Sequence, residues 1–196
     1  LDKGTLDVVY DYDGIRSRFS RDDLKASGEF SQWRYWEILP VTRREFVPPL
    51  RIGWTPLYRA DRLERQLGLN HLWLKDDTCN PSASLKDRAS VMAAVRAREL
   101  GRDIVTGAST GNAATSMSCV SAYMGIKPYI FVPERAPKAK VAQLLVYGAT
   151  VIMVRGSYDQ CFGLCWEAGE RWGWYSRNTA INPFLSEGKK TAALEI

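Results

Sequence analysis

Hydrophobic and polar positions follow a regular order in the second half of the chain. Apolar strand-like runs occupy 103–107, 128–132, 150–154 and 173–176, and helical segments over about 112–124, 137–147 and 157–172 lie between them. Strands that alternate with helices at this spacing predict parallel βαβ units with right-handed crossovers. A glycine follows each helix that precedes a run, as expected of a left-handed helix cap. These glycines are Gly101, Gly125, Gly148 and Gly173.

The first half of the chain is less regular. The stretch LDVVYDY, which begins at Leu6, predicts a strand, and Pro48-Pro49 marks a loop. A helix is predicted over 60–67 with Gly68 at its end, followed by a short strand in HLWLKDD. Another helix begins near Ser84, where Ser84 and Asp87 have the spacing of a capping box.

Composition and charge narrow the class of protein. The 196 residues are 45% hydrophobic and 25% charged, which is typical of one or two globular domains. The net charge is +5, but no block of five like charges occurs, so we expect no nucleic-acid partner. No apolar run approaches about 18 residues, so we expect no membrane span.

The residues that usually bind metals are scarce. The four cysteines form no C-x-x-C pair, and His71 is the single histidine, so we expect no metal site and no histidine-based triad. This cysteine pattern suits a reducing compartment, the cytoplasm or, in a plant, the plastid stroma. The cysteines are Cys79, Cys119, Cys161 and Cys165.

The stretch NPSASLKDRAS places Lys86 in the first turn of a predicted helix. The positive end of the helix dipole disfavours a cation there and favours a neutral amine, which is the form that a reactive lysine needs. The alternative is that Lys86 is an ordinary surface lysine in contact with solvent. Lys75 is a competitor, but it lies within a predicted strand rather than beyond one.

A second candidate feature is the loop after the strand at 103–107. Ligands of parallel sheets bind beyond the carboxyl ends of the strands. Ser109, Thr110 and Gly111 are small, so their N–H groups and the following helix N-terminus predict a site for a carboxylate or a phosphate. The alternative is a plain turn with a polar cap.

The same loop has a rival interpretation. Thr106-Gly107 through Gly111, with Tyr123-x-x-x-Lys127, partly fits a short-chain dehydrogenase. Ala113 stands where that family has its third glycine. Tyr123 falls at the far end of the same helix, so it would point away from a nucleotide at the loop.

Three motifs in order suggest a family: GWTPL at 53–57, NPSASLKDR at 80–88 and ASTGN at 108–112. Their order and spacing resemble those of the tryptophan-synthase-β-like (fold type II) pyridoxal-phosphate enzymes, most closely the threonine synthases. Two further stretches, VVYDYDGIRSRF…WRYWEILPV and NTAINPFLSEGKKTAALEI, extend the resemblance over nearly the whole chain.

The resemblance implies roles for particular residues. Lys86 matches the Schiff-base lysine, which also removes the α proton of the substrate, and Asn112 matches the asparagine that hydrogen-bonds the cofactor. Ala113 departs from the threonine of many relatives, and Leu185 stands where some have an arginine. The positions that match substrate contacts are Ser109, Thr110, Gly111, Ala113, Asn178 and Thr179.

The resemblance also implies a fold and a reaction. The fold would be α/β with open, twisted parallel sheets, in three parts: 1–100, an N-terminal extension and the first part of a larger domain; 101–178, a smaller βαβ domain; and 179–196, a return segment. The reaction would convert O-phosphohomoserine and water to L-threonine and phosphate with pyridoxal 5'-phosphate, in a homodimer.

Two other functions stay open at this stage. One is a related phosphoamino-acid enzyme such as a cysteate synthase, and the other is a non-catalytic binding fragment of the fold. The glycine-rich loop that holds the cofactor phosphate in the family is missing from the sequence. We therefore expect this chain to be part of a longer enzyme and to be inactive by itself.

Overall fold

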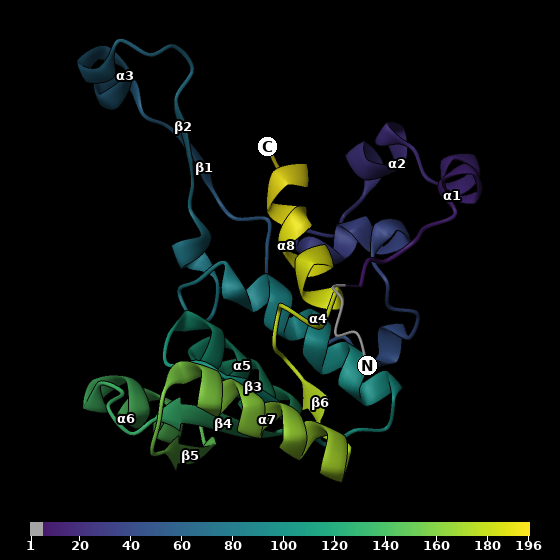
Figure 1. The fold of residues 1–196 in the computed structure, drawn as a ribbon. Coiled ribbons are helices and arrows are strands. Elements are labelled where there is room, and N and C mark those ends of the chain that lie inside the picture. Colours follow the sequence, from purple (N-terminus) through teal and green to yellow (C-terminus); the bar gives the residue numbers. More distant parts are fainter. Residues whose placement is uncertain (1–5) are drawn as a thin grey trace.

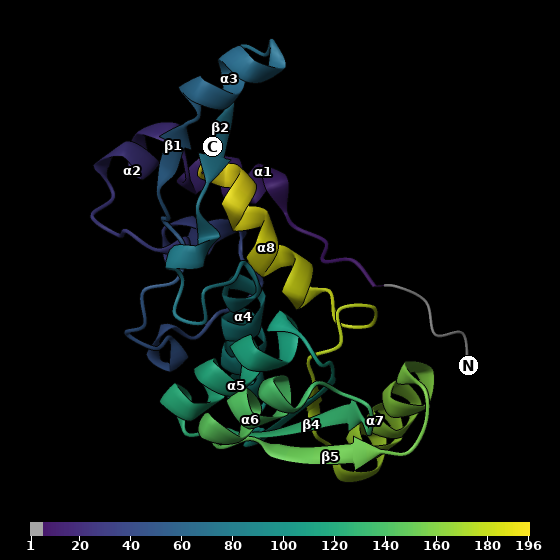
Figure 2. The same ribbon diagram turned by 90° about the vertical axis from the view of Figure 1, so that its left-hand side faces the viewer.

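The structure, a computed structural model, describes residues 6–196 and has three parts. A parallel sheet with flanking helices forms the lower part in Figure 1. Two long helices, α4 (Lys86–Glu99) and α8 (Phe184–Leu194), lie above the sheet together with the N-terminal segments. A narrow arm extends away from them, as Figures 1 and 2 both show.

The parallel sheet has the strand order β5-β4-β3-β6. Its strands are β3 (Ile104–Ala108), β4 (Lys127–Pro133), β5 (Thr150–Val154) and the two-residue β6 (Tyr175–Ser176), and all neighbours pair in parallel. The predicted α/β class with a parallel sheet is thereby confirmed. The run expected at 173–176 forms a strand only over its last two residues, because Gly173 has a left-handed φ of 66° and ends the preceding helix.

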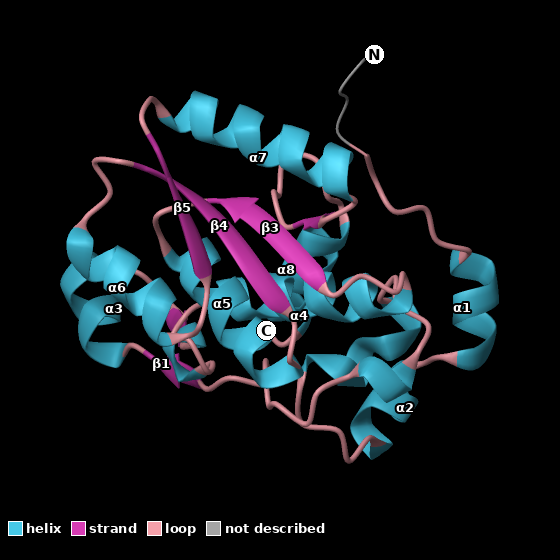
Figure 3. Cartoon of the chain, turned by 90° about the horizontal axis from the view of Figure 1, so that it is seen from below, coloured by secondary structure: helices cyan, strands magenta, loops and turns pink. Residues whose placement is uncertain are grey.

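Helices cover both faces of this sheet (Figure 3). The helices α5 (Asn112–Met124) and α6 (Lys138–Val146) lie on one face, and α7 (Tyr158–Trp172) lies on the other. Alternate residues of β4 point to opposite faces, as the pleat of a strand requires. Ile130 packs with Leu144 of α6, whereas Phe131 packs with Cys161 and Cys165 of α7.

Helix α4 is buried on nearly every side. Its side chains from Asp87 to Val95 are buried without interruption, because α5 packs on one flank and α8 on another. Its apolar residues join those of a short 3-10 helix, η1 (Gln32–Ile38), in the largest core cluster of the described residues. The element that begins with Lys86 is therefore the most enclosed helix among residues 6–196.

The strand predicted from Leu6 is wrong. Residues 6–11 have no regular structure, and the helix α1 (Tyr12–Arg18) follows, because the Asp11 side chain accepts a hydrogen bond from the Gly14 amide (2.9 Å) and starts a helix. Val9 is 93% exposed, so it packs into no sheet. Two further short helices, α2 (Arg21–Ala26) and the 3-10 turn η2 (Arg44–Phe46), complete this region.

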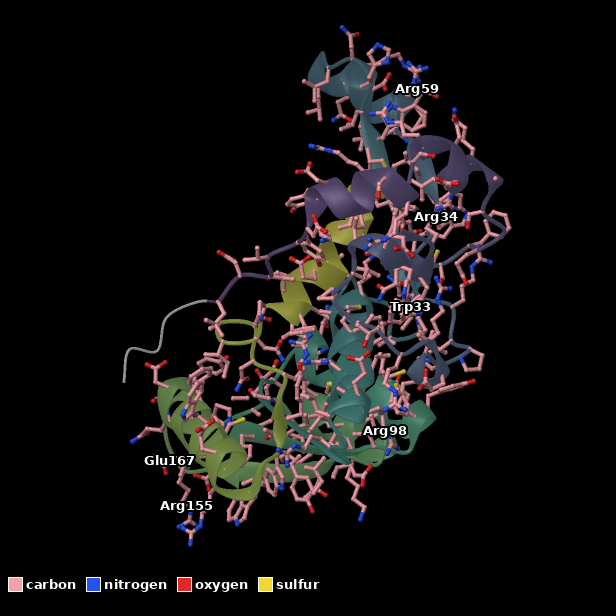
Figure 4. All side chains as sticks on the ribbon, turned by 90° about the vertical axis from the view of Figure 1, so that its right-hand side faces the viewer. Trp33, Arg34, Arg59, Arg98, Arg155 and Glu167 are labelled. Carbon is pink, nitrogen blue, oxygen red and sulfur yellow. The ribbon has the colours of Figure 1, made fainter. Side chains whose placement is uncertain are left out.

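The arm consists of an antiparallel strand pair, β1 (Leu57–Arg59) and β2 (Trp73–Lys75), joined by α3 (Asp61–Leu67). The helix expected over 60–67 and the strand expected in HLWLKDD are confirmed. Figure 4 shows Arg59 on this arm, at the opposite end of the molecule from Arg155 beside the parallel sheet. The short turn η3 (Asp77–Cys79) leads from the arm back to α4.

The structure bears on two further features, membrane-spanning helices and the state of the cysteines. Within residues 6–196, no helix is both long and apolar enough to cross a lipid bilayer. All four cysteines are free thiols; Cys161 and Cys165 are buried.

Candidate active site

Lys86 is the first residue of α4, as predicted, but the capping box expected around it is wrong. The Ser84 hydroxyl accepts from the Lys86 amide (3.1 Å). The Asp87 carboxylate instead accepts from the Ser82 amide (2.6 Å) and from the Ser82 hydroxyl. Because Asp87 is fully buried, these bonds fix the loop that leads into Lys86.

A buried ionic network anchors the same helix two residues after Lys86. The Arg88 guanidinium is fully buried and forms salt bridges with Asp77 (2.8 Å) and Glu195 (2.5 Å). Glu195 also forms a salt bridge with Lys75 (2.6 Å) and accepts from the Trp54 amide (2.9 Å). The network joins α4 to the 3-10 turn before it and to the residue just beyond α8, so the first turn of α4 is held from several sides.

Lys75, the competing lysine, belongs to this network. Its ammonium donates to the Thr55 carbonyl (2.7 Å) and pairs with Glu195, and both ions are largely buried. The Lys86 ammonium nitrogen, in contrast, has no hydrogen-bond or ion-pair partner among residues 6–196, and its side chain is partly exposed. Of the two lysines, Lys86 has the amine that is free to react.

Ser90 connects α4 with α5 one helical turn after Lys86. It lies four residues after Lys86 on the same helix face, and its hydroxyl accepts from the Ser116 hydroxyl of α5 (2.7 Å). Ser116 is in turn four residues after Asn112. Lys86 and Asn112 therefore each lie one helical turn, about 5.4 Å, before a directly bonded pair. This contact places the first turns of α4 and α5 in the same region.

In the loop between β3 and α5, two of the three amides named from the sequence are already bonded within the protein. The Ser109 amide donates to the Phe131 carbonyl (3.2 Å), and the Gly111 amide donates to the Ser109 hydroxyl (3.2 Å). The amides of Thr110, Asn112 and Ala113 have no acceptor in the described part of the chain. These three N–H groups, at a helix N-terminus, are the ones that a ligand can use.

A cavity of about 190 Å³ lies between this loop and the segment after β6. Four of the residues that resemblance assigned to the substrate line it: Ser109, Ala113, Asn178 and Thr179. Lys86, Asn112, Thr110 and Gly111 are not among the lining residues. Half of the predicted residues therefore line this cavity. Of the others, Lys86 and Asn112 begin α4 and α5, and Thr110 and Gly111 lie in the loop before α5.

The Asn178 side chain is bonded to other groups of the protein. Its side-chain oxygen accepts from the Ala108 amide (3.0 Å), and its side-chain nitrogen approaches the Cys165 sulfur (3.5 Å). The carboxamide therefore holds the carboxyl end of β3 in place. Thr179 is exposed beside it, so its hydroxyl is accessible from the cavity.

Sequence reasoning missed Arg177 and Ser90. Arg177 lines the cavity, is only 5% exposed, and donates to the Ser90 hydroxyl from two nitrogens (both 3.4 Å). The one available signal was a polar Ser90 next to the apolar run at 91–95. Leu185, in contrast, is fully buried in the core, so position 185 contributes no group to the cavity.

Comparison with known proteins identifies relatives over most of the chain. The family described as pyridoxal-phosphate dependent enzyme matches residues 49–196. The threonine synthase of Methanocaldococcus jannaschii is 40% identical over 194 residues, which are 98% of this chain and 47% of that protein. The threonine synthase of Methanosarcina acetivorans is 37% identical, with 98% and 46% covered. The chain spans about half the length of these curated relatives.

Solved structures share the fold at lower identity. Threonine deaminase isoform 2 from Solanum lycopersicum aligns with a TM-score of 0.67 at 19% identity and covers 98% of this chain and 47% of its own. A pyridoxal 5'-phosphate-dependent aspartate racemase aligns with a TM-score of 0.64 at 24% identity, covering 73% and 45%. The family match over residues 49–196, together with the parallel sheet and the helix that begins at Lys86, shows that this chain belongs to the pyridoxal-phosphate dependent enzymes of fold type II.

Proposed function

We propose that this chain carries the lysine-bearing part of an enzyme that converts O-phosphohomoserine and water to L-threonine and phosphate. Two archaeal relatives named threonine synthase, each matching nearly the whole chain, support this substrate. The observation that carries the proposal is the free amine of Lys86 at the start of an enclosed helix.

The residues present fit the cofactor of the family. Imine formation needs an amine that no carboxylate holds, and Lys86 meets that requirement among the described residues. The Asn112 side chain is exposed at the start of the neighbouring helix and would donate a hydrogen bond to the cofactor ring. When bound, pyridoxal phosphate supplies an electron sink for the carbanion at the substrate Cα.

The protein's own groups would perform three tasks. Lys86 would hold the cofactor, and its released amine would take the proton from the substrate Cα and return protons later in the reaction. The free amides of Thr110, Asn112 and Ala113 would bind the substrate carboxylate. The cavity beside Thr179 would receive the distal part of the substrate.

An activity assay on the full-length protein that contains this chain tests the substrate. We expect release of threonine and phosphate from O-phosphohomoserine, and a Lys86→Ala variant slower by at least ~10³-fold, as for loss of a general base. The exposed Lys140→Ala variant is the control. Turnover of O-phosphoserine with no turnover of O-phosphohomoserine would overturn the proposal in favour of a cysteate synthase-type reaction.

A further inference from the structure

Arg177 is a buried cation without a counter-ion. It is only 5% exposed, yet it forms no salt bridge among residues 6–196. Its only side-chain hydrogen bonds in the described part of the chain go to the Ser90 hydroxyl, and both are long at 3.4 Å. A buried charge is normally paired, so an unpaired guanidinium facing a cavity indicates an anionic ligand.

The position of this guanidinium is fixed by the fold. The Arg177 amide donates to the Thr106 carbonyl (2.7 Å), which continues the pairing of β6 with β3. Its side-chain stem runs along Gly107, where an added Cβ would lie 3.7 Å from the Arg177 Cβ. The guanidinium thereby reaches Ser90, one helical turn beyond Lys86 on α4.

Lys189 does not line the cavity, but it lies close enough to Arg177 and Lys86 for their charges to act on it. It belongs to α8, which packs directly on α4, and its neighbour Gly188 lies against the Arg88 carbonyl. Lys189 is partly buried and has no hydrogen-bond or ion-pair partner among residues 6–196. Burial, together with the positive charges of Arg177 and Lys86, lowers the pKa of Lys189.

Among residues 6–196, no carboxylate forms an ion pair with Arg177 or with Lys189. Asp87 is the acidic group whose field acts on Arg177, but both of its oxygens are engaged by Ser82. Burial lowers the pKa of the Arg177 guanidinium to about 10, which leaves it charged at neutral pH. The unpaired donors of Arg177 and Lys189 are therefore available for charge-assisted hydrogen bonds to an anion with several acceptor oxygens.

We propose that Arg177 and Lys189 bind the phosphate group of the substrate and so select phosphorylated amino acids. The inference rests on the proposed function and deepens it. Arg177 offers two or more donors in a planar fork, a geometry that suits phosphate oxygens. The accessible Thr179 hydroxyl at the same cavity would add a donor.

The test uses the full-length holoenzyme with inorganic phosphate and O-phosphohomoserine as probes. The variants are Arg177→Gln, Arg177→Lys and Lys189→Gln. The controls are Arg155→Gln and Lys140→Gln, since Arg155 projects into solvent at the edge of the sheet (Figure 4) and Lys140 is exposed on α6. Calorimetry gives the Kd of phosphate, kinetics give KM and kcat, and titration of the apoenzyme gives the affinity for pyridoxal phosphate.

We expect Arg177→Gln to raise the Kd of phosphate and the KM of O-phosphohomoserine by ~10- to 100-fold, the effect of losing a hydrogen bond to a charged group. Arg177→Lys should recover part of this loss, Lys189→Gln should show a smaller loss, and the affinity for L-threonine should not change. Recovery by lysine, together with the Lys189 variant, keeps the test decisive even if Arg177→Gln folds poorly.

Two results would overturn the proposal. One is unchanged phosphate binding in all three variants. The other is a loss of pyridoxal phosphate affinity with unchanged phosphate binding, which would assign the two cations to the phosphate of the cofactor. Failure of the wild-type enzyme to use O-phosphohomoserine would instead refute the proposed function, and phosphate calorimetry would still decide the roles of Arg177 and Lys189.

Discussion

Glu195 forms salt bridges with both Arg88 and Lys75 in the ionic network that holds the first turn of α4. Burial raises the pKa of its carboxyl, but hydrogen bonds from Arg88 and Lys75 outweigh burial and hold that pKa below its usual value. A carboxyl with a lowered pKa in the folded state stabilises the fold above its unfolded pKa, and this contribution is lost as the pH falls through the folded pKa.

A Glu195→Gln variant should therefore lose stability in a pH-dependent way. Near neutral pH its free energy of unfolding should fall by ~3–5 kcal/mol, because Arg88 and Lys75 lose a buried partner. The difference from the wild type should begin to shrink as the pH falls below about 4.3, the usual glutamate pKa, where the unfolded wild-type carboxyl takes up a proton, and it should be smallest below the lower pKa of the folded state. Urea unfolding at several pH values measures this difference, and a constant difference across the range would contradict the account.

The sequence predicts some of these residues and not others. Lys86 could be found because the start of a helix is a local pattern, and the motif around it is contiguous. Arg177 could not be found, because its role depends on β6 placing it beside Ser90, 87 positions earlier in the chain. The partner of Asp87 was assigned wrongly, since a capping box and a side chain that reaches back to Ser82 look alike in sequence.

At the scale of elements, the contact of α8 with α4 depends on one glycine. A Cβ at Gly188 would lie 2.2 Å from the Arg88 carbonyl oxygen and 2.7 Å from the Met92 Cγ, which is closer than atoms can approach. Gly163, in the middle of α7, would meet nothing within 4 Å. The two glycines therefore form a matched pair for testing the helix contact.

We expect Gly188→Ala to lower the free energy of unfolding by about 3 kcal/mol or more, because the helices must separate. Gly163→Ala should raise it by ~0.5–1 kcal/mol, since alanine is the better helix former. Thermal or urea unfolding of both variants compares them directly. Equal effects in the two variants would show that α8 does not pack tightly on α4.

The elements of the parallel sheet could be predicted because each strand is apolar and each helix ends at a glycine. The stretch from Leu6 could not be predicted, because it has a strand-like composition but no strand beside it in residues 6–196. Its aspartate starts a helix instead. Local composition gives the type of an element only where neighbouring elements are present to pair with it.

At the scale of the whole molecule, the arm is the least enclosed part of the described chain. Tyr58, Leu67 and Trp73 are each about half exposed, and its two strands have three residues each. Such short strands give little independent stability. Helix α4 and the parallel sheet, in contrast, contain fully buried residues such as Val95 and Val105.

Hydrogen exchange of this chain should reflect that contrast. Amides of 57–75 should exchange quickly, and amides of α4 and of 104–132 should exchange slowly. In the full-length protein we expect 57–75 to slow, because its exposed apolar side chains would then be covered. Equal protection of the arm and the sheet in the isolated chain would contradict this division.

The 196-residue chain alone should bind pyridoxal phosphate poorly and should not form threonine. The resemblance assigns the cofactor phosphate to a glycine-rich loop that these 196 residues do not contain, and the free amides at 109–113 are the ones proposed for the substrate carboxylate. Losing two charge-assisted hydrogen bonds costs at least about a hundredfold in affinity. Dialysis of the loaded chain followed by absorbance of the cofactor tests this, and retention of the cofactor would refute it.

In the proposed function, Lys86 is the residue that holds the cofactor. Borohydride reduction of the full-length holoenzyme, followed by peptide mapping, tests it most directly, because reduction makes the lysine–cofactor bond permanent. We expect a phosphopyridoxyl group on the peptide that contains Lys86, and none on the peptide that contains the ion-paired Lys75. A label on any lysine other than Lys86 would contradict it.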